Sequence, residues 1–504
     1  MLRRRIRIVL GVLLALFALL FVFLLFERIR GQVSLARYKR ELVAQGEKLT
    51  FRELIPPVPE GENGAPQILE ATERLQKGSV LPNNPPPMMK LVASGRAVVG
   101  FRENEWVDYD NVTNHWDALA ADLKANEVPL AQIRAALAKP VLNNQLDYSQ
   151  GLQMTCPHIG PTLSLTKWLE AETQFALHEG RLPEALDSLV AQIHLLRLLG
   201  EDRILISELV RRAIAAIARA ATWEALQADG WTDGDLARIQ QAWQAEDFMA
   251  GMARSLEVRR AFGETAFAHF SRSNEDAAYA LFLADFLSRL SRDDGAYPPN
   301  SWRATYMKQI YCWVWRLAWL HQDQRRYLEH MQRLLEATRA AAVKKSRADV
   351  QSVVAWLSEK SSNKNFYDEL RYPDPESVVI VSRGVKHAMR AETERSLTMC
   401  AVALKRYQLR YGKPPASLDA LVPEFLSSVP VDYMDGKPMK YHLNADGSFV
   451  LYSVGADGHD DGGDPSLPPD MYSYRSIWDG RDAVWPWPAL PDEIEAYHKE
   501  ARKN

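Results

Sequence analysis

The chain has 504 residues, of which 47% are hydrophobic and 25% are charged, and its formal net charge is −3. This composition is typical of a globular protein and argues against a disordered chain. The small net charge, with no stripe of Lys and Arg interleaved with aromatic residues, argues against a nucleic-acid partner. The three cysteines, Cys156, Cys312 and Cys400, are far apart in the sequence, so they indicate no disulfide framework.

The N-terminus predicts a membrane anchor. Residues 8–26 form an uncharged apolar run that spans about 30 Å as a helix, the thickness of a bilayer hydrocarbon core. Four arginines precede this run, and the positive-inside rule then keeps the N-terminus in the cytoplasm. We therefore expect a single-pass protein of the bacterial inner membrane, with the bulk of the chain in the periplasm. Residues 27–50 are expected to continue the anchor helix as a charged stalk.

A cleaved signal peptide is the main alternative to an anchor. The apolar segment of a signal peptide is usually shorter and ends in a small-residue cleavage site. Here Glu27 and Arg28 follow the run directly, and no A-x-A pattern is present. The length and the flanking residues therefore favour an anchor that stays in the membrane.

The remainder of the chain predicts a mainly α-helical protein. Its expected parts are a transmembrane anchor (1–30), a stalk with a proline-rich irregular region (31–115), an α-helical body (116–360), a linker (361–375), a small α+β module (376–470) and a C-terminal tail (471–504). The linker is predicted because residues 361–375 are polar and contain proline.

Glycine and proline punctuate the helical body. Gly180 and Pro183 predict a helix stop and a new start, because Gly suits the position after a helix and Pro suits its first turn. Gly200 and Gly230 predict the ends of the next two helices, and Thr232 or Asp233 is expected to cap a further one. The hairpin around Gly180 resembles a tetratricopeptide hairpin, so we expect a bundle of helical hairpins. Further amphipathic stretches are predicted at 246–292 and 302–345; the second contains a tryptophan-rich stripe, 311–319, expected to pack in the core.

The C-terminal module is predicted to begin with a long helix, at 378–411. A short helix at 417–422 follows, and then two strands at 439–443 and 449–454. Asp446-Gly447 between the strands is a typical turn of a β-hairpin.

Four runs of residues in this module carry a family resemblance: ALKRYQLRYGKPP (403–415), LDALVP (418–423), DGKPMKY (435–441) and LYSVGADG (451–458). They resemble, in this order, the globular domain of the major pseudopilin of type II secretion systems. The likeness covers residues 383–468, and the last run is the most specific. The rest of the chain resembles uncharacterised membrane-anchored bacterial proteins, a likeness that implies no activity.

Two features depart from the pseudopilin pattern. Pseudopilins carry the membrane segment at the start of the helix that leads into the globular part, whereas here the helical body separates the two. Gly11 is followed by Val12 and Leu13, not by the family's processing pattern. We therefore do not expect processing or assembly into a filament.

The resemblance implies a structural calcium ion in the loop after the last strand. It suggests Asp457 and Asp464 as carboxylate ligands, with a main-chain carbonyl near Ser453. Asp460 and Asp461 add two more carboxylates, and the loop is rich in glycine, which suits the oxygen-rich coordination of calcium. The spacing is not that of an EF-hand, and an ordinary solvated acidic turn is the alternative. Together with the resemblance, the residues favour calcium.

Catalytic spacings are absent from the sequence: it contains no H-E-x-x-H, G-x-S-x-G or phosphate-binding loop. Cys156 and His158, or the helical His178 and His194, do not by themselves form a site. The carboxylates of Glu170 and Glu172, and of Glu392 and Glu394, are two residues apart and therefore point to different helix faces.

Three functions are compatible with these features. The first is a non-enzymatic envelope protein that binds a protein partner through a grooved helical body. The second is an accessory component of a type II secretion or pilus-like system. The third is an enzyme whose site is assembled from scattered residues, around His158 and the tryptophan-rich stripe. The sequence favours the first, and it does not indicate whether a small-molecule ligand binds.

Overall fold

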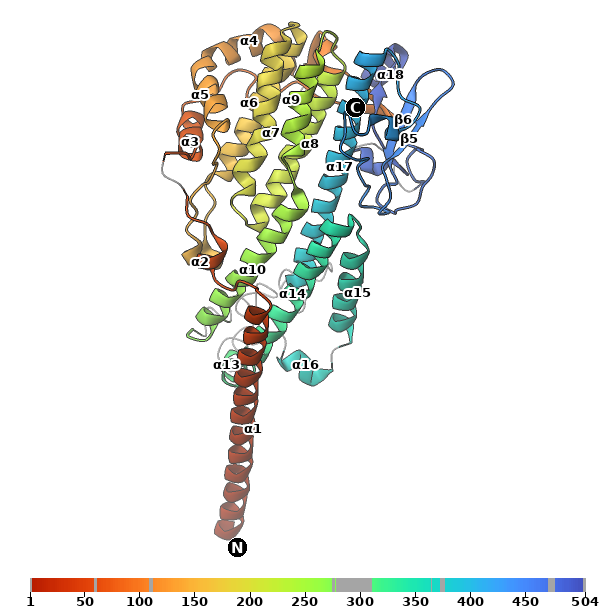
Figure 1. The fold of residues 1–504 in the computed structure, drawn as a ribbon. Coiled ribbons are helices and arrows are strands. Elements are labelled where there is room, and N and C mark those ends of the chain that lie inside the picture. The colour runs from red at the N-terminus through yellow and green to blue at the C-terminus, as the bar shows by residue number, and fades with distance from the viewer. Residues whose placement is uncertain are drawn as a thin grey trace.

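The computed structural model describes residues 2–58, 61–107, 112–273, 277, 311–363, 365–371, 377–469 and 476–501. The described chain is mainly helical, with a few small sheets, as predicted (Figure 1). Its helices are α1 (Leu2–Ala44), α2 (Phe51–Leu54), α3 (Ala65–Glu73), α4 (Trp116–Ala125), α5 (Glu127–Leu137), α6 (Ile159–His178), α7 (Leu182–Gly200), α8 (Leu205–Leu226), α9 (Asp233–Gln244), α10 (Phe248–Phe270), α13 (Cys312–Ala318), α14 (Leu320–Lys344), α15 (Ala348–Ser362), α16 (Phe366–Arg371), α17 (Ser377–Tyr411) and α18 (Pro491–Ala501). Its strands are β1 (Lys90–Ala93), β2 (Arg96–Val98), β3 (Glu105–Val107), β4 (Thr113–His115), β5 (Lys440–Leu443), β6 (Phe449–Ser453), β7 (Ala483–Val484) and β8 (Trp487–Pro488).

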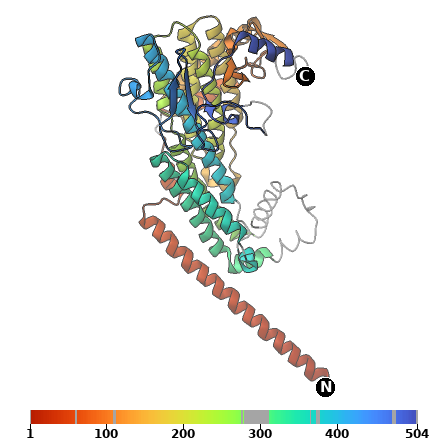
Figure 2. The same cartoon turned by 90° about the vertical axis from the view of Figure 1, so that its right-hand side faces the viewer.

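The first helix, α1, is long and apolar enough to span a membrane. It continues past the apolar run to Ala44, so the predicted stalk is helical as far as Ala44 and not to residue 50. Its N-terminal part projects away from the rest of the chain (Figures 1 and 2). Further along, Leu24, Leu35 and Leu42 are buried, because this side of the helix packs on α13 and α14.

The helix ends and helix starts that were predicted for the body are confirmed. Gly180 has φ +70° in the turn after α6, and Pro183 lies in the first turn of α7. Thr232 caps α9 through a capping box with Asp235. The helices α6, α7 and α8 pack on one another, but the structure does not establish a tetratricopeptide fold. In the predicted stretch 246–292, α10 ends at Phe270, and residues 278–292 lie outside the described residues.

The long helix α17 lies along α8, α9 and α10 (Figure 1). One hydrophobic core includes Leu165 of α6, Leu404 of α17 and Leu451 of β6. The helical body and the C-terminal module therefore share a core across the predicted linker. Within that linker the structure has the short helix α16, and residues 372–376 lie outside the described residues.

The elements of the C-terminal module agree with the prediction. A short 3₁₀ helix (Leu418–Leu421) follows α17, and β5 and β6 form an antiparallel hairpin in which Lys440 pairs with Tyr452. The tail adds contacts that the sequence does not reveal. Strand β7 joins β6, and β8 pairs in parallel with β2 of the N-terminal region. The first tail residues, 471–475, lie outside the described residues.

Candidate functional site

The predicted calcium loop follows β6, and its carboxylates bond to the loop itself and to residues next to it. Asp457 accepts a hydrogen bond from the backbone N–H of His459, and Asp460 accepts from the hydroxyl of Tyr452. Asp464 accepts from the N–H and the hydroxyl of Ser466, which hold its pKa below the usual value. Asp461 lies 3.9 Å from a guanidinium nitrogen of Arg481. The fifth predicted residue, Ser453, is fully buried, and its hydroxyl oxygen accepts from the N–H of Gly455.

Two residues outside the predicted set hold this loop in place. Arg347, between α14 and α15, donates to the carbonyl oxygens of Ala456 and Asp457, both at 2.6 Å. Asp482, in the tail, is fully buried and accepts from the N–H groups of Asp461, Gly463 and Asp464 at 3.5, 2.7 and 3.1 Å. Burial raises the pKa of Asp482, although these N–H groups act in the opposite direction. Tertiary contacts therefore order the loop.

The donor atoms of the loop suit calcium, but their arrangement does not enclose a cation. The loop supplies four carboxylates, the ligand type that calcium prefers. Across the described part of the chain, however, no group of three His, Cys, Asp or Glu side chains gathers as a metal centre would require. A bound calcium ion would require Asp457, Asp460, Asp461 and Asp464 to turn toward one point, so the calcium site stays a prediction.

Two of the histidine candidates, His158 and His178, are engaged in structural contacts. His158 is 3% exposed, and its Nε2 lies 2.8 Å from a carboxylate oxygen of Asp202. The hydroxyl of Ser207 donates to that same oxygen, so serine and histidine both bond to the aspartate and not to each other. His178 bonds to the carbonyl of Phe101 through Nδ1 and stacks on Trp116. This arrangement ties helix ends together and offers no activated nucleophile.

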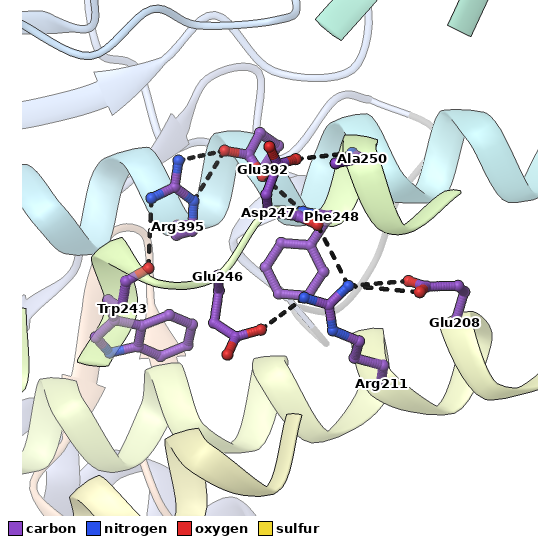
Figure 3. A network of polar contacts seen from close by, with 9 residues as sticks. All are labelled: Glu208, Arg211, Trp243, Glu246, Asp247, Phe248, Ala250, Glu392 and Arg395. Atoms are coloured by element: carbon purple, nitrogen blue, oxygen red, sulfur yellow. Dashed lines mark hydrogen bonds and ion pairs between the residues drawn. The ribbon is translucent and has the colours of Figure 1, made fainter. Parts of the chain in front are cut away.

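A buried ionic cluster lies where α8, the α9–α10 connection and α17 meet (Figure 3). Arg211 of α8 bonds to Glu208 at 3.1 Å and to Glu246 at 2.6 Å, and all three side chains are at most 4% exposed. The guanidinium of Arg211 also lies over the ring of Phe248. We call Glu208, Arg211, Glu246, Glu392 and Arg395 the joint cluster.

The α17 half of the joint cluster contacts the other half through the backbone. Glu392 accepts from the N–H of Phe248 at 3.1 Å and pairs with Arg395, whose Nε donates to it at 2.8 Å (Figure 3). Arg395 also donates to the carbonyl of Trp243. These bonds fix α17 to the start of α10 and to the end of α9.

The joint cluster keeps its arginines charged. Burial alone would lower the pKa of Arg211, but the carboxylates of Glu208 and Glu246 raise it above its usual value. Burial likewise acts to lower the pKa of Arg395. The carboxylate of Glu392 acts to raise it, and the resulting pKa is above its usual value. Burial raises the pKa of Glu208, although Arg211 acts in the opposite direction. Because the side chain of Arg211 is almost fully buried, water cannot readily replace its two carboxylate partners.

A recess of about 230 Å³ opens beside the joint cluster, between α9, α17 and the loop after the 3₁₀ helix. We call it the junction recess; residues that line it include Gln240, Gln244, Lys345, Arg395, Ser428 and Tyr433. Ligand pockets for drug-sized molecules usually measure about 300–1,000 Å³. The junction recess is smaller, so its size suits one inserted side chain better than a drug-sized molecule.

Arg395 gives the junction recess its recognition chemistry. A guanidinium has five N–H donors, and Glu392 and the carbonyl of Trp243 use three of those of Arg395. The side chain of Arg395 lines the recess and is 20% exposed. Lys345, at the end of α14, adds a second positive charge to the lining. An acceptor oxygen, above all a carboxylate, is the group that such a lining binds best.

Sequence reasoning missed the joint cluster. It considered Glu392 only as a possible partner of Glu394, and the structure confirms that these two point to different partners: Glu394 lies by Arg219 and Trp478. The available signal was a set of charged residues at positions where the helix pattern expects burial, such as Arg211. Such a position indicates a buried partner but does not say which one.

Comparison with family models, with curated proteins and with solved structures gives no match for this chain. The pseudopilin resemblance therefore stands on the residues of the C-terminal module alone.

Proposed function

We propose that this chain is a non-enzymatic, membrane-anchored binding protein that holds a protein partner at the junction recess. Helix α1 anchors it, with the arginine-rich N-terminus in the cytoplasm and the body and module in the periplasm. The observation that carries the proposal is the polar recess beside Arg395, which has donors to spare. The partner is a protein that inserts an acidic side chain.

The lining of the junction recess supports binding more than catalysis. Among the described residues that line it there is no histidine, cysteine or aspartate, and its one glutamate, Glu392, is engaged by Arg395. A general base next to a nucleophile is the arrangement that covalent catalysis requires, and this lining does not supply it. Two elements of the shared core, α9 and α17, form its walls, so its shape is set before a partner arrives.

Site-specific photocrosslinking in intact membranes tests this proposal. A benzophenone amino acid at Gln244 or Ser428, both exposed at the junction recess, should capture the same protein. The matched control is Glu184, which is also exposed but lies on α7, outside the recess. Arg395→Lys should reduce capture at both recess positions, because a lysine keeps the charge but loses the planar donors. Absence of a common captured protein at Gln244 and Ser428 would remove the proposed function.

Calcium binding at the loop 453–464 belongs to the proposal as a stabilising contact of the module. A ligand that binds only the folded state adds about 2.7 kcal/mol at a concentration one hundred times its dissociation constant. Calcium should therefore raise the midpoint of thermal unfolding, and a chelator should reverse the rise. Asp464→Asn should abolish the effect, whereas Asp446→Asn, in the hairpin turn outside the loop, should leave it intact. If calcium does not change the midpoint of thermal unfolding, calcium binding is removed from the proposal.

A further inference from the structure

Two short helices, α13 and α16, lie against α1 near the end of its apolar run. Leu24, near the end of the apolar run, is 6% exposed and packs in one cluster with Trp315 and Trp319. The ring of Phe23 contacts that of Tyr367 in α16, with centroids 6.4 Å apart. Both helices therefore reach the depth of the last apolar residues of the span. Figure 1 shows them at the end of the body from which α1 projects.

Polar contacts fix this level. Glu27, the first charged residue after the apolar run, is 2% exposed although it carries a carboxylate. It accepts hydrogen bonds from Gln322 of α14 at 2.9 Å and from the hydroxyl of Tyr367 at 2.8 Å, and it pairs with Arg30 at 2.9 Å. Because Gln322 and Tyr367 both donate to Glu27 from other helices, α14 and α16 cannot slide along α1 without removing two hydrogen bonds from a buried carboxylate.

The same helices expose large aromatic side chains. The predicted core role of the tryptophan-rich stripe holds for Trp315 and Trp319, but Trp313 is 54% exposed. Residues two apart on a helix face nearly opposite sides, so Trp313 points away from α1 while its neighbour packs on Leu24. Helix α13 has seven residues and is about 10 Å long, so Trp313 lies within that distance of Leu24 in depth. Phe366, next to Tyr367 in α16, is 76% exposed.

We propose that α13 and α16 form an interfacial collar that inserts Trp313 and Phe366 into the headgroup region of the leaflet at which α1 emerges. Tryptophan concentrates at this level of a bilayer, where its apolar ring and its polar N–H are both satisfied, and a phenylalanine ring can be buried at the boundary between headgroups and acyl chains. The occupant is the phospholipid surface, because the collar is continuous with the spanning segment and contacts its last turn. The collar gives the body a second membrane contact and sets its tilt on the bilayer. This inference rests on the anchor of the proposed function and not on the junction recess.

Photocrosslinking of the full chain, reconstituted in phospholipid vesicles, tests the collar. A benzophenone amino acid at position 313 or 366 should yield adducts with the mass of a phospholipid. Val343, on α14, is the matched control, since it is 84% exposed and apolar but lies at the far end of that helix. Replacement of these exposed residues leaves the core intact, so the variants should fold.

The outcomes separate the collar from the anchor. Leu19, inside the apolar run and 67% exposed, should give lipid adducts if α1 spans the bilayer. Adducts at 19, 313 and 366 but not at 343 support the collar. Adducts at 19 alone overturn the collar and leave the anchor standing, whereas no adduct at 19 overturns the anchor as well. Crosslinks from 313 or 366 to a second copy of the chain, in place of lipid, also overturn the collar.

Discussion

Arg211→Met is expected to lower the free energy of unfolding by about 3–5 kcal/mol, because it leaves two buried carboxylates without their partner. Glu208 and Glu246 are at most 2% exposed, so water cannot replace the guanidinium. The loss should be measured by urea unfolding in detergent micelles, followed by far-ultraviolet circular dichroism. A loss below about 1 kcal/mol would show that the joint cluster does not stabilise the fold.

Two variants separate charge pairing from the loss of a long side chain. Arg238→Met removes a surface ion pair. Arg238 lies 2.9 Å from Asp187, and both side chains are more than half exposed. It should cost less than about 1 kcal/mol. The triple variant Glu208→Gln, Arg211→Met and Glu246→Gln removes the buried charges together and should recover most of the stability lost in Arg211→Met.

Asp482→Ala is expected to release the loop 454–464 from the C-terminal module. The change removes the acceptor of three backbone N–H groups, at Asp461, Gly463 and Asp464. A lost acceptor costs about 1–3 kcal/mol at a buried donor, and 1.4 kcal/mol is a factor of ten, so hydrogen exchange at these amides should accelerate about tenfold or more.

The matched control for Asp482→Ala is Asp446→Ala. Asp446 accepts the N–H of Ser448 in the hairpin turn and has no bond to the loop among the described contacts. Its replacement should leave exchange in the loop unchanged. Equal exchange in the two variants would show that Asp482 does not order the loop.

The local elements of this protein could be predicted because their signals are local. Gly180 and Pro183 mark a helix end and a helix start through their own backbone preferences, and Asp446-Gly447 marks a hairpin turn in the same way. The long helix of the module was predicted within one residue of its observed start at Ser377. These signals say nothing about the neighbours of an element, so the shared core of the body and the module was not predictable from them.

The candidate site, too, depends on neighbours that local sequence signals do not reveal. The acidic loop was found because its four carboxylates are close in sequence, but Asp482 and Arg347, which hold it, come from distant segments. The joint cluster joins Arg211 to Glu246 and, through the N–H of Phe248, to Glu392. Each pair is separated by at least one helix boundary, so its members meet only when the helices pack.

The sequence by itself determined the apolar helix, the helical body and the order of elements in the C-terminal module. Periodicity, caps and turn residues act over a few residues, so they can be read along the chain. Only the tertiary structure decided that β8 pairs with β2, that a recess opens beside Arg395 and that Trp313 faces outward beside the anchor. The physical reason is that burial and the pairing of buried charges depend on which surfaces meet, and that choice is made by the whole core at once.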